Sequence, residues 1–166
     1  VSTGRRSAEA LLGVINDILD YSKIEAGKLD FEVTALSVMK LIEETRDLME
    51  NRAHEKGLSL IAKLDNDIPV NLVGDQGRIR QIILNFVTNA VKFTETGSVR
   101  IEVSMPSETK DAAVLHFRVV DSGIGIPADK LDDLFSEFSM VDSSFSRRSE
   151  GTGLGLFVVH KIISVP

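Results

Sequence analysis

The opening segment of the chain has the apolar spacing of an amphipathic helix. From Ser7 to Ala26, apolar residues recur at intervals of three and four, which places them along one side of a helix. Gly27 follows, and glycine often ends helices because it adopts the left-handed conformation without steric cost. We expect the single stripe to pack on another helix, although an ordinary helix of the same domain is the alternative. The stripe consists of Leu11, Leu12, Ile15, Ile18, Leu19 and Ile24.

Residues 28–36 are expected to form a linker, and two more amphipathic helices are predicted beyond it. The first begins near Ser37, a typical N-cap residue, and ends before Gly57. The second is long and begins after Asp75, which is also suited to cap a helix. The apolar side of the first carries Leu41, Ile42, Leu48 and Met49, and that of the second carries Ile79, Ile82, Ile83, Phe86, Val87, Ala90 and Val91.

Alternating apolar and polar residues predict strands at 58–64, 98–105 and 114–120, with a short apolar run at 70–73 that ends at Gly74. A polar hairpin loop, 106–112, joins the last two strands. A short helix is expected around 128–135 and a final helix from the glycines at 151–155 to about residue 164. We therefore expect an α+β fold, a two-layer sandwich of helices on one face of a mixed, mostly antiparallel sheet, preceded by a long N-terminal helix.

Composition narrows the possible functions. The 166 residues carry a net charge of −6, which argues against a nucleic-acid partner because broad binding to nucleic acid needs a basic face. There is no cysteine, which excludes disulfides, thiolate metal sites and thiol nucleophiles. No apolar run approaches the roughly 18 residues that would span a bilayer, so we expect no direct membrane contact. Because the chain opens with Val1 rather than Met, we expect a piece of a longer protein.

Three polar constellations could carry chemistry, and the first lies on the long helix. Asn85, Asn89 and Lys92 are spaced by four and three residues, so they share one helical face. Carboxamide oxygens suit Mg²⁺, which keeps several waters and shares phosphate oxygens, and the lysine would add a positive charge for those phosphates. A solvated helix face is the alternative.

The second constellation is the turn after the strand 114–120. Asp121 could accept a hydrogen bond from an exocyclic amine, which would select adenine over guanine. Gly123 and Gly125 would allow the backbone to approach a flat ligand closely. An ordinary strand-ending turn is the alternative.

The third constellation is the glycine-rich start of the final helix, at 151–155. The free amide groups and the dipole of a helix N-terminus favour a phosphate there. The spacing fits neither a dinucleotide-binding fingerprint nor a P-loop. The preceding segment, which contains Arg147 and Arg148, is expected to form a lid that places cations over phosphates, or else a surface loop.

Taken in this order, the motifs resemble those of the ATP-binding domain of sensor histidine kinases, in the same superfamily as the gyrase, heat-shock chaperone and mismatch-repair ATPases. Residues 81–94 are similar to the N box, 121–127 to the first glycine box, 134–138 to the F box and 151–156 to the second glycine box. Residues 15–27 resemble the end of the second dimerisation helix of hybrid kinases. The resemblance implies three parts: this partial helix at 1–27, the linker, and an ATP-binding catalytic domain at 37–166 whose C-terminal hairpin is missing.

The resemblance also implies roles for single residues. Asn89 would bind Mg²⁺, Asn85 would support the metal and phosphate site, and Lys92 would contact phosphate. Asp121 would accept the adenine amine. The other nucleotide-binding positions implied by the family are Gly123, Gly125, Arg147, Gly151, Thr152, Gly153, Leu154 and Gly155.

Asn85 separates the kinase from the hydrolases of this superfamily. The ATPase branches place a glutamate at that position as the base that activates water, and a neutral amide cannot take a proton. The expected function is therefore the catalytic portion of a two-component histidine kinase, which passes the γ-phosphate of ATP to a histidine. A superfamily ATPase and a truncated, non-catalytic ATP-binding or dimerisation module are the alternatives.

The three histidines, His54, His116 and His160, do not lie in an acceptor motif, so this chain is not expected to phosphorylate itself. The partners implied by the resemblance are a dimerisation domain that carries the acceptor histidine and, indirectly, a response-regulator receiver domain. The full-length protein is expected to be a homodimer. A cytoplasmic location is expected for this portion, whether or not the parent protein is anchored in a membrane.

Overall fold

A computed structural model of the chain describes residues 2–27 and 30–132. The chain divides into two compact units. Residues 31–125 form one, and the described parts of the other are residues 2–27, 30 and 126–132. The predicted F box, lid, second glycine box and final helix, with Arg147, Arg148 and His160, lie outside the described residues.

The predicted N-terminal helix is confirmed. Helix α1 spans Ser2–Glu25, and Gly27 follows it with φ 63°. Its apolar stripe is exposed except at Ile24, which is half-buried, and Leu11 and Leu12 each show about three-fifths of their surface. The same unit contains the 3₁₀-helix η1, Ala128–Lys130, where the short helix was expected to begin. None of the helices in the described residues has the length and apolar character needed to cross a membrane.

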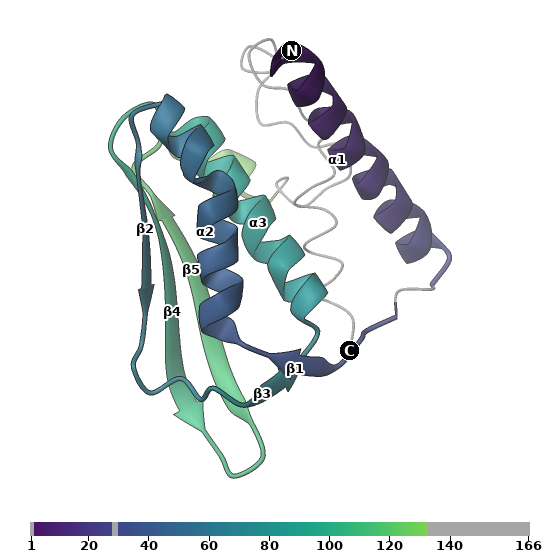
Figure 1. Cartoon of the computed structure of the whole chain (residues 1–166), viewed down its shortest axis with the longest axis vertical. Helices are drawn as coiled ribbons and strands as arrows, with labels where there is room; N and C mark the ends of the chain where they lie inside the picture. Colours follow the sequence, from purple (N-terminus) through teal and green to yellow (C-terminus); the bar gives the residue numbers. More distant parts are fainter. Residues whose placement is uncertain (1, 28–29, 133–166) are drawn as a thin grey trace. The chain divides into compact units, whose positions relative to one another are not determined.

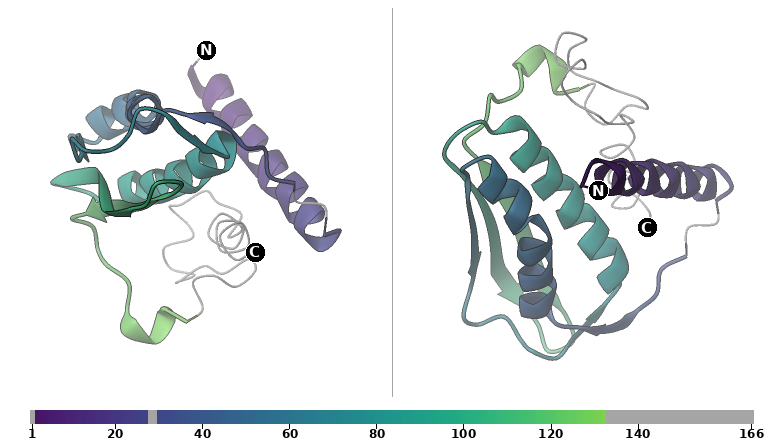
Figure 2. Two further views of the ribbon diagram at one scale, coloured as in Figure 1. Left: turned by 90° about the horizontal axis from the view of Figure 1, so that it is seen from below. Right: turned by 45° about the horizontal axis from the view of Figure 1, so that its top comes forward.

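Residues 31–125 form two layers (Figures 1 and 2). A three-stranded sheet with the order β2-β4-β5 is covered on one face by helices α2 and α3, which lie side by side. Strands β2 (Ser59–Leu64) and β4 (Ser98–Glu108) are parallel, and β5 (Ala113–Asp121) is antiparallel to β4. A small antiparallel sheet pairs β1 (Thr34–Leu36) with β3 (Leu72–Gly74). The α+β sandwich with a mixed, mostly antiparallel sheet is thus confirmed.

Both helices of this unit begin at the predicted cap residues. Ser37 caps α2, Val38–Glu55, and Asp75 caps α3, Gln76–Phe93. The Asp75 side chain accepts a hydrogen bond from the amide of Arg78 at 2.9 Å, which satisfies a donor that the first turn leaves unpaired. Helix α2 ends at Glu55, and Gly57, two residues later, has φ 69°, the left-handed conformation expected after a helix.

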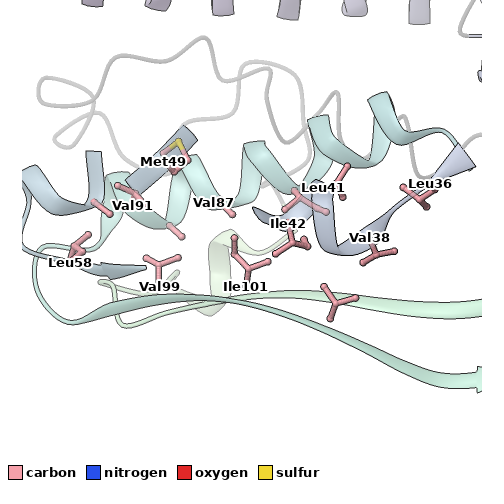
Figure 3. Packing of buried hydrophobic residues seen from close by; sticks show 14 residues of the cluster. Leu36, Val38, Leu41, Ile42, Met49, Leu58, Val87, Val91, Val99 and Ile101 are labelled. Atoms are coloured by element: carbon pink, nitrogen blue, oxygen red, sulfur yellow. The ribbon is translucent and has the colours of Figure 1, made fainter. Parts of the chain in front are cut away.

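The core lies between the two helices and the sheet (Figure 3). Strand β4 contributes Val99, Ile101 and Val103, which alternate along its inner face and are almost completely buried. The register sets Ile101 beside Ala62 of β2 and Val119 of β5, so one layer of side chains continues across all three strands. The remaining buried apolar residues are Leu36, Val38, Leu41, Ile42, Met49, Ala53, Leu58, Ile83, Val87, Ala90 and Val91.

Several sequence predictions of burial were wrong at the edges of elements. Leu48 of α2 is 63% exposed, because the buried stripe runs through Thr45, whose hydroxyl donates to the carbonyl of Leu41 at 2.8 Å. Phe86 of α3 is 37% exposed at the edge of the buried face. With Ile82, Ile83, Phe117 and Val119 it lines an apolar hollow of about 190 Å³.

Two further differences concern the short strands. The end of the predicted linker, 28–36, forms strand β1, which pairs with β3 and buries Leu36. The apolar run 70–73 is largely outside the core, since Val70 and Val73 are 80% and 76% exposed, and the strand spans Leu72–Gly74 instead. A strand of three residues is too short for its alternation of apolar and polar residues to be recognised in a sequence.

Candidate functional site

Helix α3 carries the predicted polar row. Asn85, Asn89 and Lys92 are all half-buried, and their spacing places them on one face of the helix, away from the buried Ile83 and Val87. The ammonium group of Lys92 lies 5.2 Å from the centre of the Phe93 ring, within the range of a cation–π interaction. The row therefore borders the core rather than open solvent.

The strand register brings the loop after β5 to the C-terminal end of α3. Helix α3 ends at Phe93, and the short turn 94–97 leads directly into β4. Because β5 is antiparallel to β4, its last residue, Asp121, pairs with Val99 near the start of β4. Val119 and Asp121 are two residues apart, so Asp121 faces the same side of the sheet as the helices.

A hydrogen bond joins the two segments. The amide of Ile124 donates to the carbonyl oxygen of Phe93 at 3.4 Å. Gly123, the residue before Ile124, also lies close to this carbonyl, and a Cβ at Gly123 would be 2.8 Å from the Phe93 carbonyl oxygen. Only glycine fits there without displacing backbone. The close approach at Gly123 is to helix α3, whereas the sequence predicted one to a flat ligand.

Asp121 shapes the loop that follows it. One carboxylate oxygen, Oδ1, accepts a hydrogen bond from the amide of Gly123 at 2.8 Å, as in an Asx turn. A carboxylate has a second oxygen and several lone pairs, so it can accept a bond from an amine at the same time. Asp121 is exposed, and Gly125 has φ 71° with no atom of residues 2–27 and 30–132 within 4 Å of where a Cβ would lie.

Ser122 fastens the loop to the turn between α3 and β4. Its hydroxyl donates to the Thr96 carbonyl oxygen at 3.0 Å and accepts from the Ser98 amide at 3.1 Å. The turn passes close to the hydroxyl at Gly97, where φ is +104° and a Cβ would overlap Ser122 Oγ. The loop 121–125 is thus tied to α3 at Phe93 and to β4 through Ser122.

Two residues at this junction received no separate role in the sequence analysis. Thr94 is fully buried, and its hydroxyl has no hydrogen-bond partner among the described residues. Lys56, at the end of α2, donates to the carbonyl oxygens of Val91 and Lys92 at 2.7 and 3.0 Å. Nothing in the sequence signals the Lys56 contact, because the donor and acceptors are 35 and 36 residues apart.

The donor set on α3 suits one kind of metal. Within residues 2–27 and 30–132, no three His, Asp or Glu side chains cluster as a metal site would require. The half-buried Asn85 and Asn89 instead offer amide oxygens, which fit a hard cation that takes its remaining ligands from phosphate and water. The residues present therefore fit Mg²⁺ bound together with a phosphate ligand.

The structure brings together part of the predicted site. Asp121, Gly123 and Gly125 lie in the loop that contacts the end of α3, the helix that carries Asn85, Asn89 and Lys92. The remaining predicted positions are Arg147, Gly151, Thr152, Gly153, Leu154 and Gly155, and they lie outside the described residues.

Residues 74–165 match the family described as histidine kinase-, DNA gyrase B- and HSP90-like ATPase. A hybrid signal transduction histidine kinase B of Dictyostelium discoideum is 44% identical over 156 residues, which are 94% of this chain and 8% of that protein. The signal transduction histidine-protein kinase BarA of Escherichia coli K12 is 41% identical over 164 residues, 99% of this chain and 18% of that protein. The chain thus spans less than a fifth of the length of these curated relatives.

A solved structure agrees with the sequence relatives. The crystal structure of full-length ShkA in complex with AMPPNP superposes with a TM-score of 0.78 at 33% identity, covering 97% of this chain and 32% of that one. The fold of this chain is therefore similar to that of a solved histidine kinase portion.

Proposed function

The chain belongs to the histidine kinase-, DNA gyrase B- and HSP90-like ATPase family, and we propose that it is the ATP-binding catalytic portion of a two-component sensor histidine kinase. The observation that carries the proposal is the junction between Phe93 at the end of α3 and Ile124 in the loop after β5. This junction connects helix α3, which carries the asparagines suited to Mg²⁺ and phosphate, to the loop that carries Asp121, which is suited to adenine. Both kinds of group therefore belong to one candidate nucleotide site.

Asp121 is the group that recognises adenine in this proposal. Its Oδ1 is held by the Gly123 amide, which fixes the carboxylate at the end of β5. The exocyclic amine of adenine donates to this carboxylate, whereas guanine presents a carbonyl oxygen at the equivalent position and would be repelled. Gly125 adds no side chain beside it, and no atom from the described ranges lies within 4 Å of where its Cβ would be.

Asn89 is the proposed Mg²⁺ ligand, and Asn85, one helical turn earlier, supports the metal and the phosphates. The bound Mg²⁺ would neutralise charge on the β- and γ-phosphate oxygens. Lys92 adds a positive charge one turn beyond Asn89 on the same face, which suits a contact with phosphate. The nucleotide site would be completed by residues of the expected lid and second glycine box, namely Arg147, Gly151, Thr152, Gly153, Leu154 and Gly155.

Asn85 favours transfer to a histidine over hydrolysis. In the transfer, a neutral imidazole nitrogen attacks the γ-phosphorus, the bond to the β–γ bridging oxygen breaks, and ADP leaves. The attacking nitrogen needs no base on α3, whereas a water molecule would, and the amide of Asn85 cannot accept a proton. Catalysis then depends on positioning and on neutralising phosphate charge.

The acceptor histidine would come from a dimerisation domain, and α1 is the proposed end of the second helix of that domain. Its exposed apolar stripe supports this proposal, because a four-helix bundle would bury such a stripe. His54 and His116 are exposed and belong to no such helix, so they are not proposed acceptors. From the same function we also propose that a response-regulator receiver domain is an indirect partner, that the full-length protein is a homodimer, and that this portion is cytoplasmic.

Nucleotide binding by the chain, measured by titration calorimetry with and without Mg²⁺, tests the proposal. We expect wild-type chain to bind ATP and ADP, with the Mg²⁺-dependent part of the affinity lost in Asn89→Ala. Asn51→Ala is the matched control, because Asn51 is exposed near the end of α2. A wild-type chain that binds no nucleotide, or an Asn89→Ala chain that binds ATP·Mg²⁺ as wild type does, would contradict the proposal.

A further inference from the structure

The end of α3 has an unusual set of hydrogen-bond partners. A helix leaves its last carbonyl groups without partners inside the helix, and they must be satisfied from outside. In α3 the Ala90 carbonyl accepts from the Thr94 amide at 3.1 Å, which closes the last turn. The carbonyls of Val91 and Lys92 accept from the ammonium group of Lys56, and that of Phe93 accepts from the Ile124 amide. Lys56 and the loop 121–125 therefore share the end of one helix.

The backbone of Lys56 is itself fixed. The Leu58 amide donates to Ala53 and the Gly57 amide to His54, both at 2.9 Å, and Gly57 has φ 69°, which together form a Schellman motif at the end of α2. Leu58 is buried in the core immediately after it. The Lys56 side chain thus extends from a rigid turn to the end of α3.

We propose that Lys56 is a positioning residue for nucleotide binding, which holds the last turn of α3 in the orientation that the adenine-binding loop requires. Its positive charge lies at the negative end of the helix dipole, where a cation is favourable. The two bonds from one ammonium group fix the peptide planes that precede the Phe93 carbonyl, and that carbonyl receives the loop. This inference rests on the proposed function, because the loop is where adenine would bind.

Removing the ammonium group should disturb the site without touching any nucleotide contact. In Lys56→Met, the carbonyls of Val91 and Lys92 lose their charged donor and turn toward water. The Phe93 carbonyl follows, since it belongs to the next peptide unit, and the bond to Ile124 weakens. ADP and ATP should be affected equally, because both carry the adenine that the loop receives.

Calorimetric titration of the full chain with ADP and with ATP·Mg²⁺ tests the inference. We expect Lys56→Met to raise both dissociation constants by about fivefold to tenfold, the size typical of losing charge-assisted hydrogen bonds at a partly exposed position. Lys56→Arg keeps a charged donor and should recover most of that loss. Lys63→Met is the matched control, because Lys63 is exposed on β2 and should change neither constant.

Amide hydrogen exchange in the nucleotide-free chain supplies a readout that overall destabilisation would not produce. Exchange at Ile124 should accelerate in Lys56→Met, whereas exchange at Ile101 in the centre of β4 should not.

Equal nucleotide affinities in wild type and Lys56→Met, or failure of Lys56→Arg to recover the loss, would overturn the inference. If wild type bound no nucleotide, the proposed function would fail, and unchanged exchange at Ile124 would separately overturn the role of Lys56. Should Lys56→Met not fold, Lys56→Gln replaces it, and the same outcomes apply.

Discussion

Gly123 is the residue at which helix α3 and the loop after β5 come closest. A methyl group there would lie 2.8 Å from the Phe93 carbonyl oxygen and 2.7 Å from Asp121 Oδ1. The Phe93 oxygen is a backbone atom that cannot rotate away, so the loop must shift as a whole. We expect Gly123→Ala to weaken ADP binding by at least about tenfold and to lower the free energy of unfolding by about 1–3 kcal/mol, as overpacking commonly does.

Gly125→Ala is the control for the stability part of that prediction only, because Gly125 belongs to the proposed nucleotide site. Within the described part of the chain, a Cβ at Gly125 meets no atom within 4 Å, so its cost to stability is that of the φ of 71°, about 1–2 kcal/mol for a non-glycine residue. Urea unfolding of both variants and ADP titration of Gly123→Ala measure the two effects. If Gly123→Ala bound ADP as tightly as wild type, the close contact between loop and helix would have no part in the site.

At the scale of single residues, the sequence predicted which residues share a face better than it predicted which atoms they contact. The spacing of Asn85, Asn89 and Lys92 fixes their common face, because helix geometry alone decides it. The contact of Gly123 is different: sequence reasoning expected close approach to a ligand, and the structure shows close approach to Phe93. That partner depends on the pairing of β4 with β5, which no local pattern contains.

At the scale of elements, Asp75 links two segments of the chain. Oδ1 caps α3 by accepting from the Arg78 amide, and Oδ2 accepts from the Glu32 amide, 43 residues earlier, at 2.8 Å. Asp75→Ala removes both bonds and should cost about 1–2 kcal/mol of the free energy of unfolding. Asp75→Asn keeps one acceptor oxygen and should cost about half as much.

Urea unfolding followed by circular dichroism measures both variants. Ser37→Ala is a useful comparison, because its hydroxyl accepts one bond only, from the Lys40 amide at a long 3.4 Å, and its loss should cost less than that of Asp75. An Asp75→Asn chain as unstable as Asp75→Ala would contradict the two-bond assignment.

Caps and long periodic stretches were predicted correctly because their signals are local. Ser37, Asp75 and the glycines at 27 and 57 mark the ends of helices as expected. The predicted burial of Leu48 and Phe86 was wrong, because an apolar residue at the edge of a helix face is buried only if a neighbouring element covers it. Strand β1 was missed because three residues form a strand only through their partner, β3.

At the scale of the whole molecule, residues 31–125 are expected to fold without α1. Among the residues whose burial the structure describes, the buried apolar side chains of this unit lie between Leu36 and Val103. Removing residues 1–27 should therefore leave the urea midpoint of this unit unchanged within error and should leave its affinity for ADP intact. A shortened chain that unfolds at markedly lower urea would contradict a boundary between residues 27 and 31.

The central claim is that the chain transfers the γ-phosphate of ATP to a histidine supplied by another helix. The most direct test mixes the chain with ATP labelled at the γ-phosphate, Mg²⁺ and a separate dimerisation domain that carries an acceptor histidine. We predict that label appears on the acceptor in an acid-labile, base-stable form, that Asn89→Ala abolishes it, and that little phosphate is released without acceptor. Steady phosphate release in the absence of acceptor, with no label on the histidine, would contradict the account.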